Sequence, residues 1–574
     1  MTQTVQVSPP GRQSVPAARP AKVLITLGVV LLSAVLLYFN YPQRYEYRDI
    51  DETGYLNGSL EVLEGITPGN GFAPAGPQIW LGWARVGAQA AKNILRPTAS
   101  ERAEPMQVRP YSAINRALFD NYRDLSNLHT FVIRANILLA LAAAAAAAGL
   151  GMRLGGLAGG ALLGGLVAAT PIFMGFAEQS RPYSNAWSFA IIAFYFAATC
   201  KGRRQVWLTG LFLGLSIASR IEMAWAVPLA WWIIGSRPDR SHPLATILKI
   251  TALMAVFAYL FAPWLLTDFF ANLRTIATVG FGIPLPGIKR FTYPLYVFGI
   301  QQGMIGCVLL ALGGLIFARP GARLRLWILG GYGALLLAVM ITGFGMGIHQ
   351  HPGLFLTMFI LSAASVSALR SRWPREIPAV IAIVLAFSTF REIQTIRQYR
   401  ALYDHEQSTQ WIEAHVPAGT TVYFSSGGYR SLLPTPASAD ALWSEVTDDQ
   451  AWRKKFESGL KHFHVTTDQL PRALSEANLL LERSNRRGWF ILGSRTDLPD
   501  PRYDIRLVLT SPIFGVQDLQ TAMRQQGGIL VWRESGSNLK KPDLGPPLVQ
   551  WLNQDGYGTS IYCTPDVRAK IKLP

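Results

Sequence analysis

The sequence predicts an α-helical membrane protein with about eleven transmembrane helices, followed by a small α/β domain. Half of the 574 residues are hydrophobic, only 15% are charged, and the mean hydropathy of +0.22 is high for a soluble protein. Apolar runs of about 14 to 24 residues with almost no charge recur between residues 23 and 390, and such runs are typical of membrane spans. Beyond residue 400 the composition becomes polar, which indicates a separate domain.

The first apolar run, residues 23–39, is interpreted as an uncleaved anchor. Arg12, Arg19 and Lys22 precede it, as in a signal peptide, but no small-x-small cleavage site follows. Residues 1–22, rich in Pro, Ser and Gln, are expected to form a disordered tail. The further predicted spans are 131–150, 156–177, 185–200, 206–219, 221–235, 245–264, 294–317, 326–342, 353–369 and 377–390.

The charge distribution predicts the topology. The net charge of +18 comes from 53 basic and 35 acidic residues, and the basic residues cluster in short loops between apolar runs. That pattern is typical of membrane proteins, so no nucleic-acid partner is expected. Residues 206–219 and 221–235 fit either one long tilted helix or two short helices. Two crossings place eight arginines on the cytoplasmic side: Arg237, Arg240, Arg319, Arg323, Arg325, Arg370, Arg372 and Arg375.

The opposing loop, residues 265–293, carries only Arg274, Lys289 and Arg290, so the positive-inside rule favours two crossings. We therefore expect a multi-pass protein of the inner (plasma) membrane, with a cytoplasmic N-terminus and an extracytoplasmic C-terminal domain.

Two large segments then lie outside the membrane. The first loop, 40–130, contains an amphipathic stretch, Gln78–Ile94, expected to lie along the membrane surface with its Trp residues at headgroup level. The segment 401–574 is expected to form the α/β domain. Its candidate strands are Thr421–Phe424, Trp489–Leu492, Ile505–Leu509 and Ile529–Trp532, and its helical patterns include Gln450–Leu460 and Thr467–Arg483.

An acidic cluster, Asp49-Ile50-Asp51-Glu52, lies about ten residues beyond the first span. Charge close to hydrocarbon is costly, so a carboxylate held there usually serves chemistry. The alternative is a solvated acidic turn, or an Asp51 side chain that caps a following helix. The sequence contains no CxxC pair, zinc-ligand spacing, Walker motif or dinucleotide-binding glycine motif. The glycines of 155–165 fit close helix packing in lipid.

The stretch Arg48–Leu56, followed by Glu64–Pro68 and Pro74–Pro77, resembles the start of the GT-C superfamily of integral-membrane glycosyltransferases. Bacterial protein-mannosyltransferase-like and aminoarabinose-transferase-like members of that superfamily often have a similar Asp-Glu, Tyr, Gly and Pro pattern there. The resemblance continues at Glu178–Tyr183, at Gly210–Trp232 and at Ile348–Pro352. It covers residues 20 to about 400, and so implies a GT-C-like catalytic module over 23–400.

The resemblance implies a glycosyltransferase whose donor is a sugar on a polyprenyl phosphate, presented among membrane lipids from the outer leaflet. An acidic residue of the first outer loop would act as general base on the acceptor hydroxyl or amine. That group attacks the anomeric carbon with inversion, and the lipid phosphate leaves. By position Asp51 is expected to be the base, Glu52 would assist, and Asp49 is the competitor.

The same resemblance suggests binding residues. Arg181, Arg220 and His351 are the first candidates to bind the donor phosphate, followed by Arg290 and Arg391. As alternatives, Arg181 and Arg391 would snorkel to the interface, and Arg220 would form a buried structural pair with Glu222.

Tyr55 and Tyr183 are candidates to contact the sugar, although an aromatic belt explains such residues equally. A divalent cation held by His349 and His351 with the acidic pair is a weaker expectation. No other cofactor is expected.

Two other functions stay open on the sequence alone. One is a non-catalytic membrane protein that binds glycan or anchors an assembly. The other is a flippase or transporter of lipid-linked sugars, against which stand the long first loop and the absence of a repeat between the two halves. The sequence leaves open whether a hexose or a pentose is moved, and whether the acceptor is a glycan, a lipid or a protein.

Overall fold

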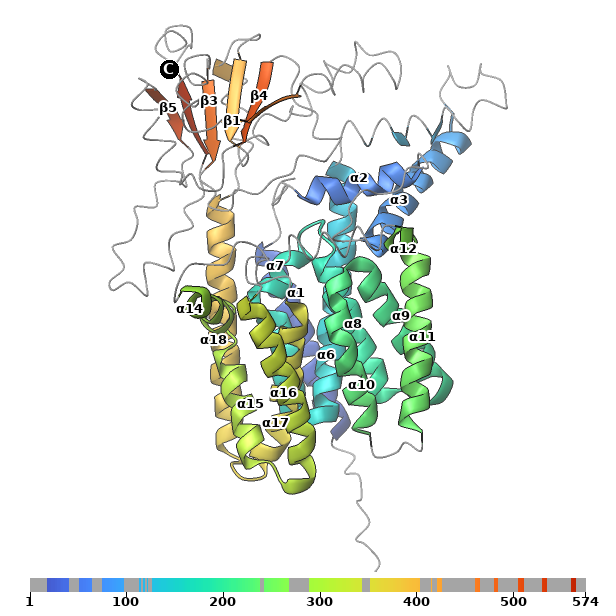
Figure 1. Ribbon diagram of the computed structural model, residues 1–574, viewed down its shortest axis with the longest axis vertical. Coiled ribbons are helices and arrows are strands. Elements are labelled where there is room, and N and C mark those ends of the chain that lie inside the picture. The colour runs from blue at the N-terminus through green and yellow to red at the C-terminus, as the bar shows by residue number, and fades with distance from the viewer. Residues whose placement is uncertain are drawn as a thin grey trace, which may run out of the picture.

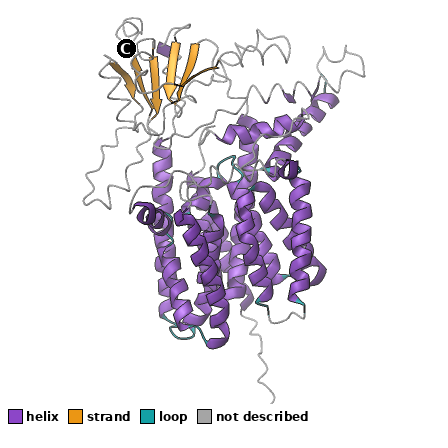
Figure 2. Ribbon diagram, viewed as in Figure 1, coloured by secondary structure: helices purple, strands orange, loops and turns teal. Residues whose placement is uncertain are grey.

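The computed structural model describes residues 18–40, 51–63, 75–97, 126–237, 242–267, 289–342 and 351–402, short helical pieces at 113–121 and 414–415, and six β-strands between 421 and 563. The long helices pack side by side as a bundle (Figure 1), and the strands form one sheet past the C-terminal end of the last long helix (Figure 2). Within these ranges the side chains of residues 51–54 lie outside the description.

Every predicted span coincides with helix. The helices are α1 (Ala18–Asn40), α2 (Asp51–Leu63), α3 (Gly76–Leu95), α6 (Ser126–Ala169), α7 (Pro171–Ala177), α8 (Tyr183–Thr199), α9 (Gly202–Ser219), η1 (Ile221–Ala226), α10 (Val227–Gly235), α11 (Pro243–Phe261), α12 (Trp264–Thr267), α14 (Lys289–Tyr296), η2 (Val297–Gln301), α15 (Ile305–Phe317), α16 (Pro320–Thr342), α17 (Pro352–Arg370) and α18 (Glu376–Leu402). By length and composition, five described helices can cross a membrane, or six if the bent pair Pro294–Gln301 and Ile305–Phe317 is one span. Eleven crossings therefore stay a prediction.

Helix α1 begins at Ala18, five residues earlier than the apolar pattern predicted. Residues 18–22 of the expected disordered tail are therefore helical. Arg and Lys are good helix formers, and the exposed side chain of Lys22 keeps its charge in water while the backbone continues the helix.

Helix α6 is a hairpin of two antiparallel legs. Gly155 and Gly156 interrupt it with non-helical dihedrals, and Gly156 has a φ of 68° that favours glycine. The legs touch beyond this turn, because a Cβ added at Gly151 would overlap the carbonyl oxygen of Gly159, and one at Gly164 would press on Ala148. The two legs match the separate spans predicted from the sequence, and the glycines serve close packing as expected.

The segment from α9 to α10 also folds back on itself. Arg220 has extended dihedrals (φ −154°, ψ 127°) and ends α9. At the far end of the return segment, Arg237 donates from Nη1 to the carbonyl oxygen of Cys200 at 2.6 Å. Residues 237 and 200 are therefore neighbours, so the structure has the two-helix alternative and not one long tilted helix.

Basic loops gather at one end of the bundle, called here the basic end (residues 200–204, 236–237, 318–325 and 370–375). Arg325 donates to the Ser236 carbonyl at 2.8 Å, and Arg372 stacks 5.1 Å from the ring centroid of Phe317. The opposite end, with α2, α3 and the start of α8, is called the α2 end (Figure 1). The positive-inside rule favours a cytoplasmic basic end, and this orientation stays a prediction.

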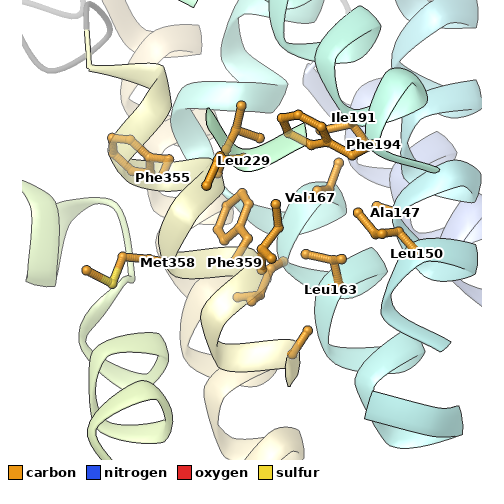
Figure 3. Packing of buried hydrophobic residues seen from close by; sticks show 14 of the residues in the cluster. Ala147, Leu150, Leu163, Val167, Ile191, Phe194, Leu229, Phe355, Met358 and Phe359 are labelled. Atoms are coloured by element: carbon orange, nitrogen blue, oxygen red, sulfur yellow. The ribbon is translucent and has the colours of Figure 1, made fainter. Parts of the chain in front are cut away.

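Helix α17 lies at the centre of the bundle. Of its most apolar window 83% is buried inside the protein, against 11% for α11 at the periphery. Figure 3 shows Phe359 of α17 close to Leu163 and Val167 of α6, with Ile191 and Phe194 of α8 nearby, while Met358 extends from the opposite side of α17. Small residues of α6 such as Ala147 complete this contact, so the helices approach closely.

Helix α3 forms where the amphipathic pattern predicted it, but its apolar stripe has a different partner. Ile79, Val86 and Ala90 are buried against the rest of the protein, whereas Trp83 and Ile94 are 39% and 44% exposed. The stripe that was expected to rest on the membrane therefore packs on α2 and on the bundle helices α6 and α9. The placement of Trp83 at headgroup level stays a prediction.

The C-terminal segment contains one six-stranded sheet. Its strands are β1 (Thr421–Ser425), β2 (Leu460–His464), β3 (Leu479–Arg483), β4 (Asp504–Leu509), β5 (Ile529–Arg533) and β6 (Thr559–Cys563), in the order β2-β4-β1-β3-β6-β5. The first four strands of that order pair in parallel, and β6 is antiparallel to β3 and β5. Parallel pairs need long crossover connections, which are usually helices. Those connections lie outside the described residues, so the α/β domain stays a prediction.

Three of the four predicted strands coincide with β1, β4 and β5. The predicted helix Thr467–Arg483 is wrong at its end, since Leu479–Arg483 is strand β3. A short apolar run such as Leu479-Leu480-Leu481 fits a buried parallel strand and a buried helix equally well. Trp489–Leu492 and residues 450–459 and 467–478 lie outside the described residues.

Packing in the α6 hairpin gives a stability prediction. Gly151→Ala should lower the midpoint of thermal unfolding in detergent, because the added methyl overlaps the Gly159 carbonyl, and such overpacking costs about 1–3 kcal/mol. The matched control is Gly331→Ala in α16, where a Cβ meets nothing within 4 Å. The control should be neutral or slightly stabilising. Equal midpoints for the two variants would show that the hairpin is not packed this tightly.

Candidate active site at the α2 end of the bundle

Arg181 is presented by a buried turn, Glu178–Pro182, between α7 and α8. The Nε2 amide of Gln78 in α3 donates to the carbonyl oxygen of Ser180. The Nδ2 amide of Asn136 in α6 donates to the carbonyl oxygen of Gln179 at 2.8 Å. Two helices thus fix the backbone of this turn, and the Arg181 side chain is only 7% exposed.

Arg220 is presented by the break between α9 and η1. The amide N–H of Ala75 donates to the carbonyl oxygen of Ser219 at 3.1 Å, and that of Met223 to the carbonyl oxygen of Arg220 at 3.1 Å. The guanidinium pairs with Glu222, with Nε donating to Oε2 at 3.2 Å and Nη2 donating to Oε1. The two side chains are 4% and 9% exposed, so the buried pair considered from the sequence is present.

Tyr183, the first residue of α8, brings the two arginines together. The guanidinium carbons of Arg181 and Arg220 lie 4.8 Å and 3.9 Å from the centroid of its ring. The two carbons are therefore within about 9 Å of each other. Stacking on one aromatic ring stabilises both cations in a buried place. Guanidinium groups bind anions with several acceptor oxygens, such as a phosphate, through parallel hydrogen bonds.

Helix α2 reaches the same place through Tyr55. This side chain is buried in a cluster with Ile79, Ala218 and Trp264, and it interacts electrostatically with Arg220. Helix α2 begins at Asp51, so position 51 lies one helical turn before position 55, on the same face.

Position 52 lies instead one turn before Leu56, which packs in a second cluster with Val86 and Leu128. The helical phase therefore distinguishes Asp51 from Glu52. Their side chains, and all of Asp49, lie outside the described residues.

An aromatic layer separates these polar groups from the apolar core. Its ring centroids are 6.0 Å apart for Phe173 and Trp187, 5.5 Å for Trp187 and Phe355, and 5.0 Å for Phe298 and Phe355. Trp187 follows Tyr183 by one turn of α8, and Phe355 follows His351 by one turn of α17. Tyr183 and His351 therefore lie on the same side of the layer, toward the α2 end.

His351 is the N-cap residue of α17, outside the membrane-spanning part of that helix. It is partly buried, and its Nε2 atom makes no hydrogen bond to any residue that the structure describes. Burial lowers its pKa to about 4, so the ring is neutral at pH 7. A neutral imidazole contributes one hydrogen bond to a phosphate or a sugar hydroxyl, but no positive charge.

The remaining predicted cations are less informative. Arg391 of α18 donates from Nε to the carbonyl oxygen of Gln301 at 3.4 Å and from Nη1 to Gln394. It therefore lies against η2, where the chain bends by 94°, and its partners differ from those of Arg181 and Arg220. Arg290 belongs to α14, but its side chain is outside the described residues.

The sequence reasoning missed several residues of this region. Gln78 and Asn136 hold the turn of Arg181, and Glu392 is a carboxylate only 1% exposed beside Arg391. Each is a polar side chain within a helix that is otherwise largely apolar, which is the signal that would have identified it.

No group of three potential metal ligands occurs among the described residues. His349 and the side chains of Asp51 and Glu52 fall outside that description, so the cation site expected from the sequence was not tested.

Comparison with known proteins found matches among solved structures only. No family model matches the chain, and no curated protein sequence matches it. Among solved structures, the chain is similar to the oligosaccharyltransferase of Archaeoglobus fulgidus, at 12% identity and a TM-score of 0.40, over 80% of this chain and 67% of that one. It is similar to ArnT from Cupriavidus metallidurans at 11% identity and a TM-score of 0.42, over 81% and 93%.

The arabinofuranosyltransferase AftD from Mycobacteria is a third similar structure. It has 15% identity and a TM-score of 0.40, over 95% of this chain and 40% of that one. At these identities and TM-scores, what this chain does has to be argued from its own residues.

The buried imidazole predicts acid sensitivity. The pKa of His351 is about 4 in the folded protein and about 6.5 in the unfolded chain. Between pH 6.5 and pH 4, therefore, the unfolded state takes up a proton and the folded state does not. Stability present above pH 6.5 is therefore lost as the pH falls toward 4, by up to about 3 kcal/mol. His351→Asn should flatten this loss, which thermal unfolding across the pH range measures. An unchanged pH profile in the variant would assign the acid sensitivity to other groups.

Proposed function

We propose that this chain is a membrane glycosyltransferase that moves a sugar from a polyprenyl-phosphate donor to an extracytoplasmic acceptor with inversion. The observation that carries the proposal is the buried pair Arg181 and Arg220, which stack on one tyrosine ring at the α2 end of an apolar bundle. Ionisable side chains buried at the end of membrane-spanning helices usually mark a functional site, and guanidiniums suit the oxygens of a phosphate. A lipid phosphate is an anion that can reach such a place from the bilayer.

In this proposal the two arginines bind the phosphate that leaves. The bond from the anomeric carbon to the phosphate oxygen breaks, and the oxygen keeps the electron pair. Charge then develops on the phosphate, so fixed guanidinium donors stabilise the transition state more than the ground state. The neutral His351 adds one hydrogen bond to the same group or to the sugar.

Asp51 is proposed as the general base. Helix α2 carries position 51 one turn from Tyr55, and Tyr55 interacts with Arg220. In this proposal the Asp51 carboxylate takes the proton of an acceptor hydroxyl or amine, while that group attacks from the face opposite the phosphate. Position 52 is on the face toward Leu56, which favours Asp51 over Glu52.

Tyr183 receives a different role from the one expected. Its ring is only 3% exposed and contacts two guanidiniums, so we assign it as a platform for the arginines and not as a surface for the sugar. Tyr55 is likewise buried against apolar neighbours. In this proposal other residues contact the sugar. The identities of the sugar and of the acceptor stay open.

The general base can be tested directly. Asp51→Asn should reduce sugar transfer by at least about 100-fold, because general base catalysis contributes about 10²–10⁴ in rate. Transfer is measured on purified protein from a polyprenyl-phosphate sugar to membrane acceptors. Binding of undecaprenyl phosphate should be unchanged. Asp49→Asn and Glu52→Gln are the matched controls and should keep more activity. Wild-type transfer by the Asp51 variant would remove this residue from the mechanism.

The arginine pair predicts a ranking of variants. Arg181→Gln and Arg220→Gln should each weaken binding of undecaprenyl phosphate by about 10- to 100-fold, since a hydrogen bond to a charged group contributes about 1.5–3 kcal/mol. Arg391→Gln, whose partners lie on η2, should have a smaller effect. Vesicle or nanodisc binding assays with the uncharged undecaprenol give the baseline. A larger effect at Arg391 than at Arg220 would move the phosphate site to the bend of the η2–α15 pair.

A further inference from the structure

We propose that Glu222 is a positioning residue that aims the guanidinium of Arg220 at the donor phosphate. The proposal rests on the phosphate-binding function proposed above for Arg220. It assigns to Glu222 a role beyond neutralising a buried charge. Three features of the described structure support this proposal. Glu222 occupies one edge of the Arg220 guanidinium, the Tyr183 ring covers one face of it, and only one residue separates Arg220 from Glu222.

A guanidinium has five N–H donors arranged along edges of a planar fork. Glu222 accepts from Nε and Nη2, so it occupies the side edge of Arg220. The described residues contain no hydrogen-bond partner for Nη1. One N–H of Nη2 and both of Nη1 therefore remain. The remaining N–H of Nη2 and one N–H of Nη1 form the end edge of the fork, and the second N–H of Nη1 points toward the Cδ side. The end edge is the one that can bind two oxygens of a phosphate at once.

The plane of the guanidinium is fixed as well. Its carbon lies 3.9 Å from the centroid of Tyr183, so the ring covers one face. A carboxylate along one edge and an aromatic ring across one face leave little freedom of rotation about the long side chain. The end edge is thus held in one direction before any ligand binds, and such preorganisation lowers the entropy cost of binding.

The backbone between the two residues is short and fixed. Arg220 and Glu222 are separated by one residue, where α9 stops and the 3₁₀ helix η1 begins. The amide of Met223 donates to the Arg220 carbonyl at 3.1 Å and closes this turn. A regular α-helix would point residues two apart to different faces. The change from α9 to η1 therefore allows the pair to form.

Removing the carboxylate has two opposing effects on an anion. Without Glu222, the site is one charge more positive, which attracts phosphate. Yet the guanidinium loses the group that holds its edge, and a buried cation left without its partner moves toward other acceptors. We expect the loss of orientation to dominate, because the phosphate needs two parallel hydrogen bonds from one fixed fork.

The test measures binding of undecaprenyl phosphate, against undecaprenol, to the full chain in phosphatidylcholine nanodiscs. Glu222→Gln should weaken phosphate binding by about tenfold, equal to about 1.4 kcal/mol, with little effect on undecaprenol. Glu222→Asp should restore part of the affinity. Arg220→Gln with Glu222→Gln should bind no more weakly than Arg220→Gln alone, because the effect acts through Arg220. Glu376→Gln, at the first turn of α18, is the matched control and should bind as wild type.

Several outcomes would overturn the proposal. Wild-type affinity in Glu222→Gln, together with a loss in Arg220→Gln, would leave the phosphate site intact and reduce Glu222 to a structural partner. Tighter binding in Glu222→Gln would show that the carboxylate competes with phosphate. If Glu222→Gln binds undecaprenol as weakly as undecaprenyl phosphate, this variant has a folding defect and Glu222→Asp decides. The shorter Asp side chain cannot hold the guanidinium in the same place, so full wild-type phosphate affinity in Glu222→Asp would contradict positioning. If wild type itself does not prefer the phosphate over undecaprenol, the proposed function fails first.

Discussion

The structure of the α2 end depends on one constraint, which is that two buried guanidiniums have to be stabilised at the edge of an apolar bundle. A single tyrosine ring accepts both of them, and one carboxylate neutralises Arg220. Helices α3 and α6 support this arrangement from outside the turn. Gln78 and Asn136 fix the turn of Arg181, and Ala75 fixes the end of α9. Helix α3 is therefore as much a part of the site as α8 and α9, although it precedes them by a hundred residues in the chain.

The close packing below the site follows from small residues. Glycines at the α6 turn, and at Gly210 and Gly214 of α9, let backbones approach to distances that any Cβ would prevent. Large aromatic rings then fill the space above this packed region, from Phe173 through Trp187 and Phe355 to Phe298. Small residues pack in the interior, and aromatic rings lie between them and the α2 end. This arrangement separates the charges of Arg181 and Arg220 from the apolar core.

Much of this architecture could be predicted from the sequence, because membrane spans give a strong signal. Every predicted span coincides with helix, and the turn at Arg220 was resolved correctly from arginine counts alone. Helix α3 was found from its period, but its partner was not, since an apolar stripe looks the same whether lipid or protein covers it. Strand β3 was predicted as helix for a similar reason, because three consecutive leucines carry no period.

The candidate site was predictable only as a set of residue types. Arg181, Arg220 and Tyr183 stood out as polar groups among apolar spans, and the structure brings these three together. Their mutual geometry depends on two helix ends that are distant in sequence, so no local pattern could give it. The roles of Gln78 and Asn136 were hidden for the same reason, since each acts on a backbone carbonyl far along the chain.

Helix α18 has a mechanical consequence of its own. It runs without interruption from Glu376 to Leu402, and beside the bend of the η2–α15 pair its Ser388 hydroxyl donates to the Gly303 carbonyl. From Arg391 the helix continues for about 16 Å toward the sheet, at 1.5 Å per residue. A helix that continues without a break keeps its backbone hydrogen bonds along its length, so a displacement of its end at Leu402 reaches the bend through a single rigid element.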